Sequence, residues 1–496
     1  MRQGIFSLLS GLILWVSFNG FLSAQGGRYW DQNLNSEAAL LSGAVVAGEG
    51  GIAAIFYNPA TISEMKKDNL SLSANLASSY YYNAKNALGT DLTLDRLQAY
   101  IYPRIVTLTF NPKKQPDLTI ELAYFTKANN YIQINQGTSL AGDIIASNPG
   151  NEQYTADYYL RSRFQDFYAG AGFGYKVSDD LALGFSGLLS YKDDQFYNMV
   201  TVNAFTTDYQ EASPQYLSEA SYHLKYNMFD VRLITKLGIQ LRQNSWKFGA
   251  NINLPSLKIF GNGTVVKQYE YSNIHTETGN PEASSLYYGG RQKGCPAHFR
   301  DPLSIAAGAN YRTPSGNTVL LFTAEYFFGM KSFNYIEASN DPGEKGYNHN
   351  PVDPEEWLSF TSVHKPVLNA GMAFKTVISD RMVYSGGFRT DFNYIGPVDN
   401  PEFPWYNTNT FYVFDVYHLN SGVNYSFKRG SMTLGMQFSH GRANDQDQIF
   451  NLTEPVEYIS STQMPLTGVK NNQVQVRYWA VSAYFGFVFD FLKQNE

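Results

Sequence analysis

The chain has 496 residues and a formal net charge of −6, and it is rich in aromatic rings but poor in charge. Aromatic residues make up 16% of it, the same share as charged residues, whereas a soluble domain usually carries more charge. The mean hydropathy of −0.30 indicates that apolar residues are not gathered into long runs. These values argue against a soluble domain and favour a membrane β-barrel, in which apolar and polar residues alternate and aromatic residues form girdles.

The first 24 residues are typical of a secretory signal peptide. Arg2 supplies a positive charge, the stretch from Ile5 to Phe18 is apolar, and Leu22-Ser23-Ala24 is a plausible cleavage site. An uncleaved anchor helix is the alternative, but the apolar stretch is short for a bilayer. After residue 24, no stretch approaches the length that a membrane-spanning helix needs.

A Gly/Ala-rich segment, residues 25–67, precedes the first expected strand. A helix capped by Asn35 or Ser36 is expected to run to about Gly43. Asn58-Pro59 predicts a rigid turn, because proline fixes its own φ and disfavours helical geometry in the residue before it. Such a segment fits best inside the barrel as a plug; a plain connector to the first strand is the alternative. The candidate ligand-binding or gate residues are Leu40, Leu41, Val45, Ile52, Ile55, Phe56, Asn58, Pro59 and Ala60.

From residue 68 to 496, apolar and polar residues alternate with a period of two, which is the pattern of strands. The pattern predicts an all-β membrane protein with a single closed antiparallel barrel of about fourteen strands. The expected strands are 69–82, 96–111, 118–136, 157–177, 180–205, 216–241, 245–268, 298–313, 317–336, 358–377, 380–396, 410–428, 431–448 and 472–491.

Short and long connections alternate along the whole chain. The short ones are rich in Pro, Gly, Asn, Asp and Ser, the residues that turns select. They are Asn111–Asp117, Val177–Asp180, Arg242–Ser245, Thr313–Asn317, Ile378–Asp380 and Lys428–Ser431. Long loops are expected at 83–95, 137–156, 206–215, 269–297, 337–357, 397–409 and 449–471. Because bacterial barrels place short turns in the periplasm, both termini are expected on the periplasmic side of the outer membrane.

The segment around the Asn-Pro-Ala turn resembles the N-terminal hatch of the FadL/TodX long-chain fatty-acid transporters. The resemblance is carried by Ser36–Ala44 and by Phe56–Ala60, and it extends to hairpins such as Phe167–Tyr175, Trp246–Asn251 and Pro302–Arg312. It implies a hatch in the lumen of a barrel, and a hydrophobic ligand such as a fatty acid, a detergent-like molecule or an aromatic hydrocarbon. It also implies that the ligand leaves sideways into the membrane.

No pattern of catalysis or cofactor binding stands out. The glycines of Gly170–Gly174 lie within an expected strand and open no helix, so they do not form a nucleotide loop. The seven histidines lack metal-ligand spacing. Lys66-Lys67 and Lys113-Lys114 are too short for nucleic-acid binding. We therefore expect no enzyme, cofactor, metal or nucleic acid. Cys295, the only cysteine, excludes an internal disulfide and is expected in a large loop.

The sequence therefore predicts passive uptake of hydrophobic compounds across a Gram-negative outer membrane, gated by the plug. The partners are a hydrophobic small molecule and outer-membrane lipid. A PorV-type partner of a secretion system is the main alternative, since such barrels share the fold and an Asn-Pro-Ala turn. A general porin needs no apolar plug and is less favoured. An outer-membrane hydrolase with a Ser/His pair across strands is a further alternative.

Overall fold

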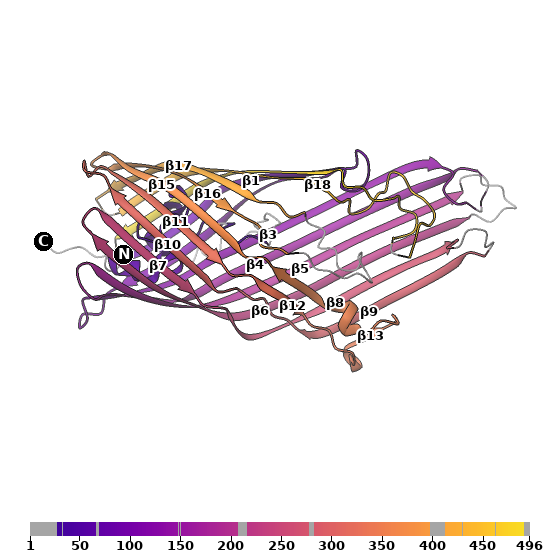
Figure 1. Cartoon of the computed structure of the whole chain (residues 1–496), viewed down its shortest axis with the longest axis horizontal. Helices are drawn as coiled ribbons and strands as arrows, with labels where there is room; N and C mark the ends of the chain where they lie inside the picture. The colour runs from indigo at the N-terminus through magenta and orange to yellow at the C-terminus, as the bar shows by residue number, and fades with distance from the viewer. Residues whose placement is uncertain are drawn as a thin grey trace, which may run out of the picture.

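The computed structural model describes residues 27–31, 33–65, 69–146, 148, 150–206, 216–276, 282–396, 412–428, 430–461 and 463–490. The expected signal peptide lies outside these residues. Long antiparallel strands form a tilted cylinder, and a small helical segment lies inside one end of it (Figure 1).

The inner segment contains α2 (Ser36–Leu40), η1 (Gly51–Ala53), α3 (Ala54–Tyr57) and η2 (Pro59–Glu64). The strands of the first half are β1 (Asn69–Lys85), β2 (Leu94–Phe110), β3 (Leu118–Gly142), β4 (Glu152–Lys176), β5 (Leu181–Thr206), β6 (Leu217–Gln243), β7 (Trp246–Asn253), β8 (Leu257–Ile274) and β9 (Ser284–Pro296). Those of the second half are β10 (Ser304–Arg312), β11 (Thr318–Phe327), β12 (Met330–Ile336), β13 (Gly346–Asn348), β14 (Phe360–His364), β15 (Val367–Ser379), β16 (Met382–Asp391), β17 (Val416–Phe427), β18 (Gly430–Gln446) and β19 (Val474–Asp490). Loop helices η3 (Gly343–Lys345) and α4 (Pro354–Leu358) complete the described elements.

The cylinder is closed because β1 pairs with both β2 and β19. At the end of the barrel that carries the short turns, fourteen strands form the ring: β1 to β7, β10, β11 and β15 to β19. The predicted fold class and strand number are confirmed. All six expected short connections join neighbouring strands at this end, where the start of β1 and the end of β19 also lie.

Three of the expected strands, 245–268, 317–336 and 358–377, are each broken into two, which the sequence analysis missed. The chain leaves the ladder at Leu254–Ser256, between β7 and β8, and again between β9 and β10. Similar breaks separate β11 from β12 and β14 from β15. The predicted loop 269–297 is wrong over most of its length, because β8 continues to Ile274 and β9 begins at Ser284. Cys295 accordingly lies buried in β9 rather than in a loop.

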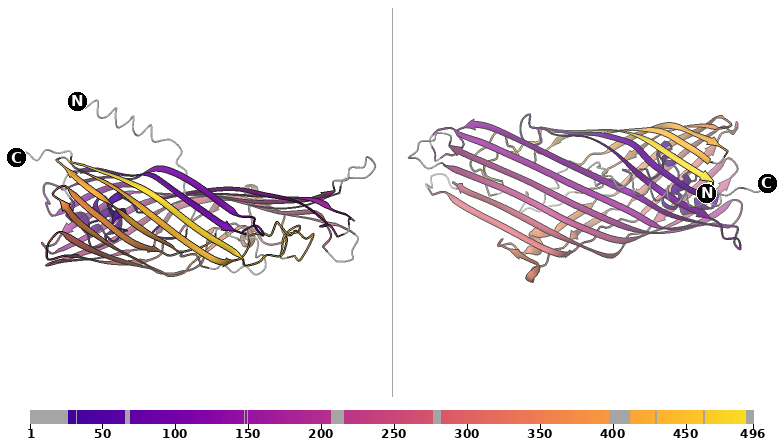
Figure 2. Two further views of the ribbon diagram at one scale, coloured as in Figure 1. Left: turned by 90° about the horizontal axis from the view of Figure 1, so that it is seen from above. Right: turned by 180° about the vertical axis from the view of Figure 1, so that it is seen from behind.

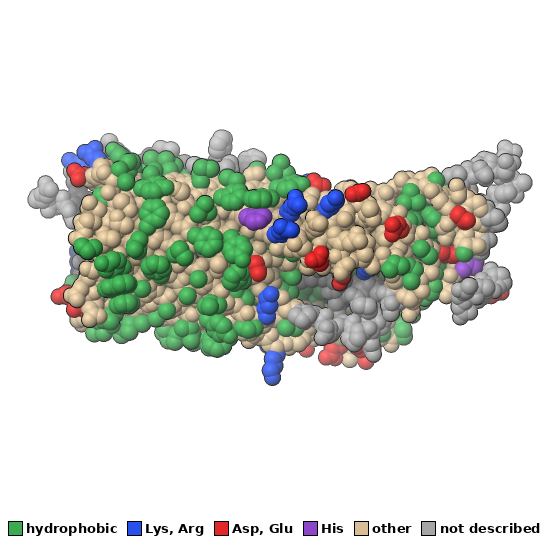
Figure 3. All heavy atoms as spheres, turned by 45° about the horizontal axis from the view of Figure 1, so that its top comes forward, with side chains coloured by type: hydrophobic (Ala, Val, Ile, Leu, Met, Phe, Trp, Pro, Cys, Tyr) green, Lys and Arg blue, Asp and Glu red, His purple; other side chains and the backbone are tan. Residues whose placement is uncertain are grey.

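The outer surface of the turn-side half is a hydrophobic band. Space-filling atoms show it as dense apolar side chains that thin out along the molecule (Figure 3). Exposed members include Leu122, Phe173, Phe185, Leu189, Leu237, Ile239, Ile252, Phe322, Leu368, Met372, Leu419, Leu434 and Met436. Stacked rings mark its far edge, where Tyr124 meets Phe167 and Tyr191 meets Phe229. This arrangement is typical of strands facing lipid, with aromatic girdles at the interface.

The strands on one side are much longer than a bilayer requires. β5 has 26 residues and β6 has 27, whereas about 9–11 tilted residues span the hydrocarbon. Beyond the hydrophobic band, β3 to β6 and β8 therefore form a projecting wing (Figures 1 and 2). Its inner face is filled by loops: the hydroxyl of Tyr154 donates to the carbonyl of Leu466 at 2.9 Å, and Tyr158 packs on Phe450. None of the described helices is long and apolar enough to cross a membrane.

One lengthwise discontinuity in the wall lies between β2 and β3. β2 and β3 pair only from Ile105 to Phe110 and from Phe125 to Ile120. Farther from the short turns, Leu94–Pro103 of β2 pairs with β1 but not with β3, and Thr126–Gly142 of β3 pairs with β4 but not with β2. We call this boundary the β2–β3 seam. It starts beside Val106 and Tyr124, which are exposed members of the hydrophobic band.

Candidate functional site

The plug segment, residues 27–65, lies within the turn-side end of the ring (Figure 2). Its first helix begins as the sequence predicts: Asn35 caps α2 by accepting a hydrogen bond from the amide of Ala38. The helix ends at Leu40, three residues earlier than expected. α2 contacts β16 to β19 and β1, whereas η2 contacts β3 to β6 on the opposite wall, so the segment bridges the lumen.

Glycines in the wall make room for the plug backbone. Gly174, Gly184 and Gly238 are register partners on β4, β5 and β6, so they form a row without side chains. A methyl group on Gly184 would lie 2.5 Å from the carbonyl oxygen of Pro59 and closer still to the amide of Ala60. Close backbone approach of this kind is available only at glycine. A second glycine pair, Gly249 on β7 and Gly308 on β10, lies beneath Val46 and Ala47.

Asn58 is the hydrogen-bonded centre of the plug and is fully buried. Its amide group donates to the carbonyl of Val46 at 2.7 Å and to the carbonyl of Ile239 in the wall at 3.1 Å. Its side-chain oxygen accepts from the amide of Ala60 at 3.1 Å. The side chain therefore joins two parts of the plug to each other and to β6.

Two apolar clusters hold the plug against the wall. Ile52, Ile55 and Ile62 pack with Phe125, Tyr168 and other residues of β2 to β6. On the other side, Leu41 and Val45 pack with Val319, Leu321 and Ala373. Burying apolar area is worth about 25 cal/mol per Å². The plug is therefore seated by burial as well as by hydrogen bonds.

Ion pairs fasten the plug at the turn-side mouth. Glu49 accepts from the ammonium of Lys375 at 2.8 Å, and Glu64 pairs with Arg242 at 2.6 Å and Lys247 at 2.9 Å. Burial alone would raise the pKa of Glu49, but Lys375 beside it holds the pKa below its ordinary value. Glu49 is thus ionised and paired at neutral pH.

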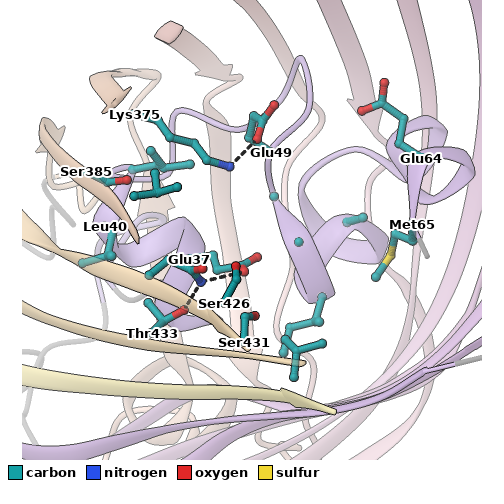
Figure 4. A pocket seen from close by; sticks show the side chains of 18 of the residues that line it. Glu37, Leu40, Glu49, Glu64, Met65, Lys375, Ser385, Ser426, Ser431 and Thr433 are labelled. Carbon is teal, nitrogen blue, oxygen red and sulfur yellow. Dashed lines mark hydrogen bonds and ion pairs between the residues drawn. The ribbon is translucent and has the colours of Figure 1, made fainter. Parts of the chain in front are cut away.

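Between these pairs the mouth opens into a cavity of about 700 Å³ (Figure 4). Glu37, Leu40 and Met65 of the plug face serines and Thr433 of β16 to β18 across it. Lining groups of both charge signs make the cavity a wet vestibule rather than an apolar pocket.

A second chamber lies on the other side of the plug, around Phe56. The ammonium of Lys236 lies 4.0 Å and that of Lys127 5.3 Å from the centre of this ring. Lys127 also donates to the carbonyl of Tyr29 at 3.0 Å. Lys236 is 5% exposed and makes no hydrogen bond or ion pair with the described residues. The remaining lining includes Trp30, Tyr57, Asn251, Thr323, Glu325 and Arg389.

This chamber is nearly closed, with room for about 20 Å³. That volume is about one water-sized probe. It lies beside the start of the β2–β3 seam, because Phe56 packs edge-on against Phe125 with ring centres 5.8 Å apart. A larger molecule can enter only if the plug or the wall moves.

The nine predicted site residues do not form one pocket. Leu40, Leu41 and Ile52 line the vestibule, and Phe56 alone among the nine lines the second chamber. Val45, Ile55, Asn58, Pro59 and Ala60 are buried against the wall or within the plug. The sequence analysis missed Lys127 and Lys236. They could have been noticed as charged residues at positions of an alternating strand that face the lumen.

Farther into the lumen, Arg232 joins three carboxylates. It pairs with Asp166 at 2.8 Å, Asp301 at 2.6 Å and Asp230 at 3.3 Å. The ammonium of Lys192 lies 3.5 Å from the centre of the Phe299 ring nearby. This network makes the barrel interior polar, and Asp166 also accepts a hydrogen bond from the Ser190 hydroxyl at 2.5 Å. Among the described residues, no group of His, Cys, Asp and Glu could hold a metal ion.

No family model matches the sequence, and no curated protein matches it. Solved structures do match, over nearly the whole chain. The P. putida toluene transporter TodX is 12% identical, with a TM-score of 0.50, and the match covers 92% of this chain and 98% of that one. The Ralstonia pickettii toluene transporter TbuX is 11% identical, with a TM-score of 0.49 and coverages of 92% and 98%. A Pseudomonas aeruginosa FadL homologue is 10% identical, with a TM-score of 0.49 and coverages of 96% and 100%.

At these identities the likeness concerns the arrangement of the backbone rather than the cargo. The resemblance that the Asn-Pro-Ala turn suggested is confirmed at that level. The chain has the fold of the FadL/TodX channels for hydrophobic compounds.

Proposed function

We propose that this protein is an outer-membrane channel for the passive uptake of hydrophobic compounds, such as long-chain fatty acids, and that its plug is the gate. It is a transporter rather than an enzyme. The short turns and both chain ends face the periplasm, and the wing projects from the cell. The signal peptide, the plug and the barrel are the three parts of the chain, with boundaries near residues 24 and 67. The description of TodX and TbuX as toluene transporters supports this proposal.

The observation that carries the proposal is the β2–β3 seam. An apolar tail in water costs about 25 cal/mol of free energy per Å² of its exposed surface. A route from the lumen into the bilayer therefore needs much less free energy than passage through a water-filled pore. At the seam no strand pairing has to be broken, and the seam begins beside the hydrophobic band. The apolar cluster of Ile55, Phe125 and Tyr168 lies directly inside its lower end.

The chamber at Phe56 supports an amphiphile with an anionic head. A buried ammonium without a partner is costly, so the cation of Lys236 favours a ligand that brings a carboxylate. Lys127 supplies a second positive charge on the same ring. Phe56, Tyr29 and Trp30 offer aromatic surface for the first part of the tail.

Gating follows from the size of this chamber. Its 20 Å³ cannot hold a fatty acid, so entry of the ligand requires the plug to withdraw from the wall. Asn58 is the contact that must break, because it alone ties the Pro59 turn to both Val46 and Ile239. The gate is therefore closed when empty.

The test is equilibrium binding to the purified, detergent-solubilised barrel. The probes are palmitic acid and hexadecanol, which have equal chain length and differ in charge. Lys236→Met should weaken palmitate binding about tenfold, the value of one charge-assisted contact, and leave hexadecanol binding unchanged. The matched control is Lys258→Met, which removes an exposed lysine from β8.

Equal effects of Lys236→Met on both probes would contradict the anionic head group. If the parent protein binds neither probe, the uptake function itself is wrong. In that case a protein that co-purifies in equal amounts would support the alternative, a partner of a secretion system.

A further inference from the structure

The outer face of the wing carries a groove that the uptake function does not use. Its cavity measures about 340 Å³ and is lined by Tyr159, Arg161, Gln195, Phe196, Tyr197, Lys225 and Asn227. The wall of the groove contains no carboxylate. It crosses β4, β5 and β6, on the side of the sheet away from the lumen.

The strand register builds this groove as two polar rows. Arg161, Tyr197 and Lys225 are consecutive partners across β4, β5 and β6, so a tyrosine stands between two cations. Gln195 and Asn227 are partners in the row beneath. The Tyr159 ring meets the Tyr197 ring edge-on, with centres 5.4 Å apart. The surface thus combines cations, aromatic faces and amides within a few ångströms.

The two cations are not neutralised by the described part of the protein. Both are exposed, and neither Arg161 nor Lys225 has a described carboxylate within 4.0 Å. The guanidinium of Arg161 lies over the face of the Tyr131 ring, 5.8 Å from its centre. Arg163 in the row beneath is bound to Gln165 and lies near the carboxylate of Asp193, to which Gln195 donates at 3.2 Å, so Arg163 adds little net charge.

The distance of the groove from the hydrophobic band indicates which layer of the membrane surface it faces. The hydrophobic band ends at Phe167 on β4, and Arg161 lies six residues farther along this strand on the side away from the band. At about 3.3 Å per residue this is about 20 Å along the strand, or roughly 14 Å in height for a strand tilted by 45°. The polar interface of a leaflet is only about 5–8 Å thick. The groove therefore faces the layer of sugars and phosphates borne by outer-leaflet lipid.

We propose that this groove binds the phosphorylated saccharide head of an outer-leaflet glycolipid. Arg161 and Lys225 hold phosphate, for which arginine and lysine are the usual ligands. Tyr197 and Tyr159 provide faces for sugar rings, and Gln195 and Asn227 bond hydroxyl groups. The proposal rests on the orientation given under Proposed function, but not on the transported compound.

The experiment measures glycolipid binding by native mass spectrometry of the full-length protein in dodecyl maltoside at low salt. The probe is deep-rough lipopolysaccharide, and the comparison probe is the same molecule after chemical dephosphorylation. No transported ligand is present. The parent should retain the phosphorylated probe at least about tenfold more strongly than the dephosphorylated one.

The test variant is the double substitution Arg161→Gln with Lys225→Gln. It should lose this preference, and heat-modifiable mobility on gels should show an undiminished folded barrel. The matched control is Arg442→Gln with Arg477→Gln, which removes two exposed, register-paired cations from β18 and β19. It should bind like the parent.

Equal loss in both double variants would mean that total charge, not the groove, governs binding, and would overturn the proposal. Parental binding by the Arg161/Lys225 variant would overturn it as well. So would equal retention of both probes by the parent. Failure of palmitate binding with intact glycolipid binding would refute the uptake function alone.

Discussion

Gly184→Ala tests whether the plug is the gate. Gly184 lies in β5 with extended backbone, so alanine suits the strand itself. The added methyl group would lie 2.1 Å from the amide nitrogen of Ala60 and from the carbonyl carbon of Pro59, whereas ordinary contact begins near 3.4 Å. The turn must therefore withdraw by about 1.3 Å.

That movement breaks the bonds between the turn and the wall. The bond from Asn58 to the carbonyl of Ile239, now 3.1 Å, lengthens beyond 3.5 Å, and the bond from Asn251 to the carbonyl of Tyr57 is strained with it. Two such bonds contribute about 1–3 kcal/mol. The open form of the plug should therefore become about 5- to 150-fold more populated.

The assay is ion conductance of single barrels in planar bilayers. Gly184→Ala should open far more often than the parent at equal folded yield. Gly187→Ala is the matched control, because its methyl group would meet only the Phe185 ring at 3.8 Å on the outer face. If Gly184→Ala conducts like the control, the plug does not gate the barrel.

Two further predictions concern the mouth and the orientation. The Glu49–Lys375 ion pair stabilises the plug at pH values above the ordinary pKa range of a carboxyl group. This contribution to stability is lost as the pH falls through the lowered pKa of Glu49. Conductance should therefore rise in acid, and Lys375→Met should conduct at neutral pH as the parent does in acid; a flat pH profile in the parent would contradict this. An epitope tag inserted at Ser315 should be inaccessible to antibody on intact cells, whereas one at Asn340 should be labelled, and reversed labelling would refute the orientation.

The strand number and the short turns were predictable because their signals are local. Alternation with period two marks each strand, and residues such as those of Thr313–Asn317 mark each turn. The breaks had weaker signals, namely Pro255 and Pro366. The loop predicted at 269–297 was wrong over most of its length, and Gly289, Gly290 and Gly294, a residue type more common in turns, lie in β9.

The site depends on register, which local patterns do not specify. Asn58 could be singled out from the Asn-Pro-Ala turn, but not its bond to Ile239, 181 residues away. Alternation places Lys236 on the inward face of β6. Only the folded ring shows that it meets Phe56. Likewise, no sequence pattern aligns Gly174, Gly184 and Gly238, which come from three strands.

The pairing of β1 with β19 has a consequence for the order of assembly. Asn69 opposes Asp490, so the cylinder joins the beginning of the strand series to its end across more than 400 residues. Such long-range closure costs chain entropy and comes late in folding. The N-terminal segment lies on its glycine row inside this ring, and its helix α2 contacts both β1 and β19. Closure of the ring therefore encloses the segment, and a chain that lacks β19 would leave it unenclosed.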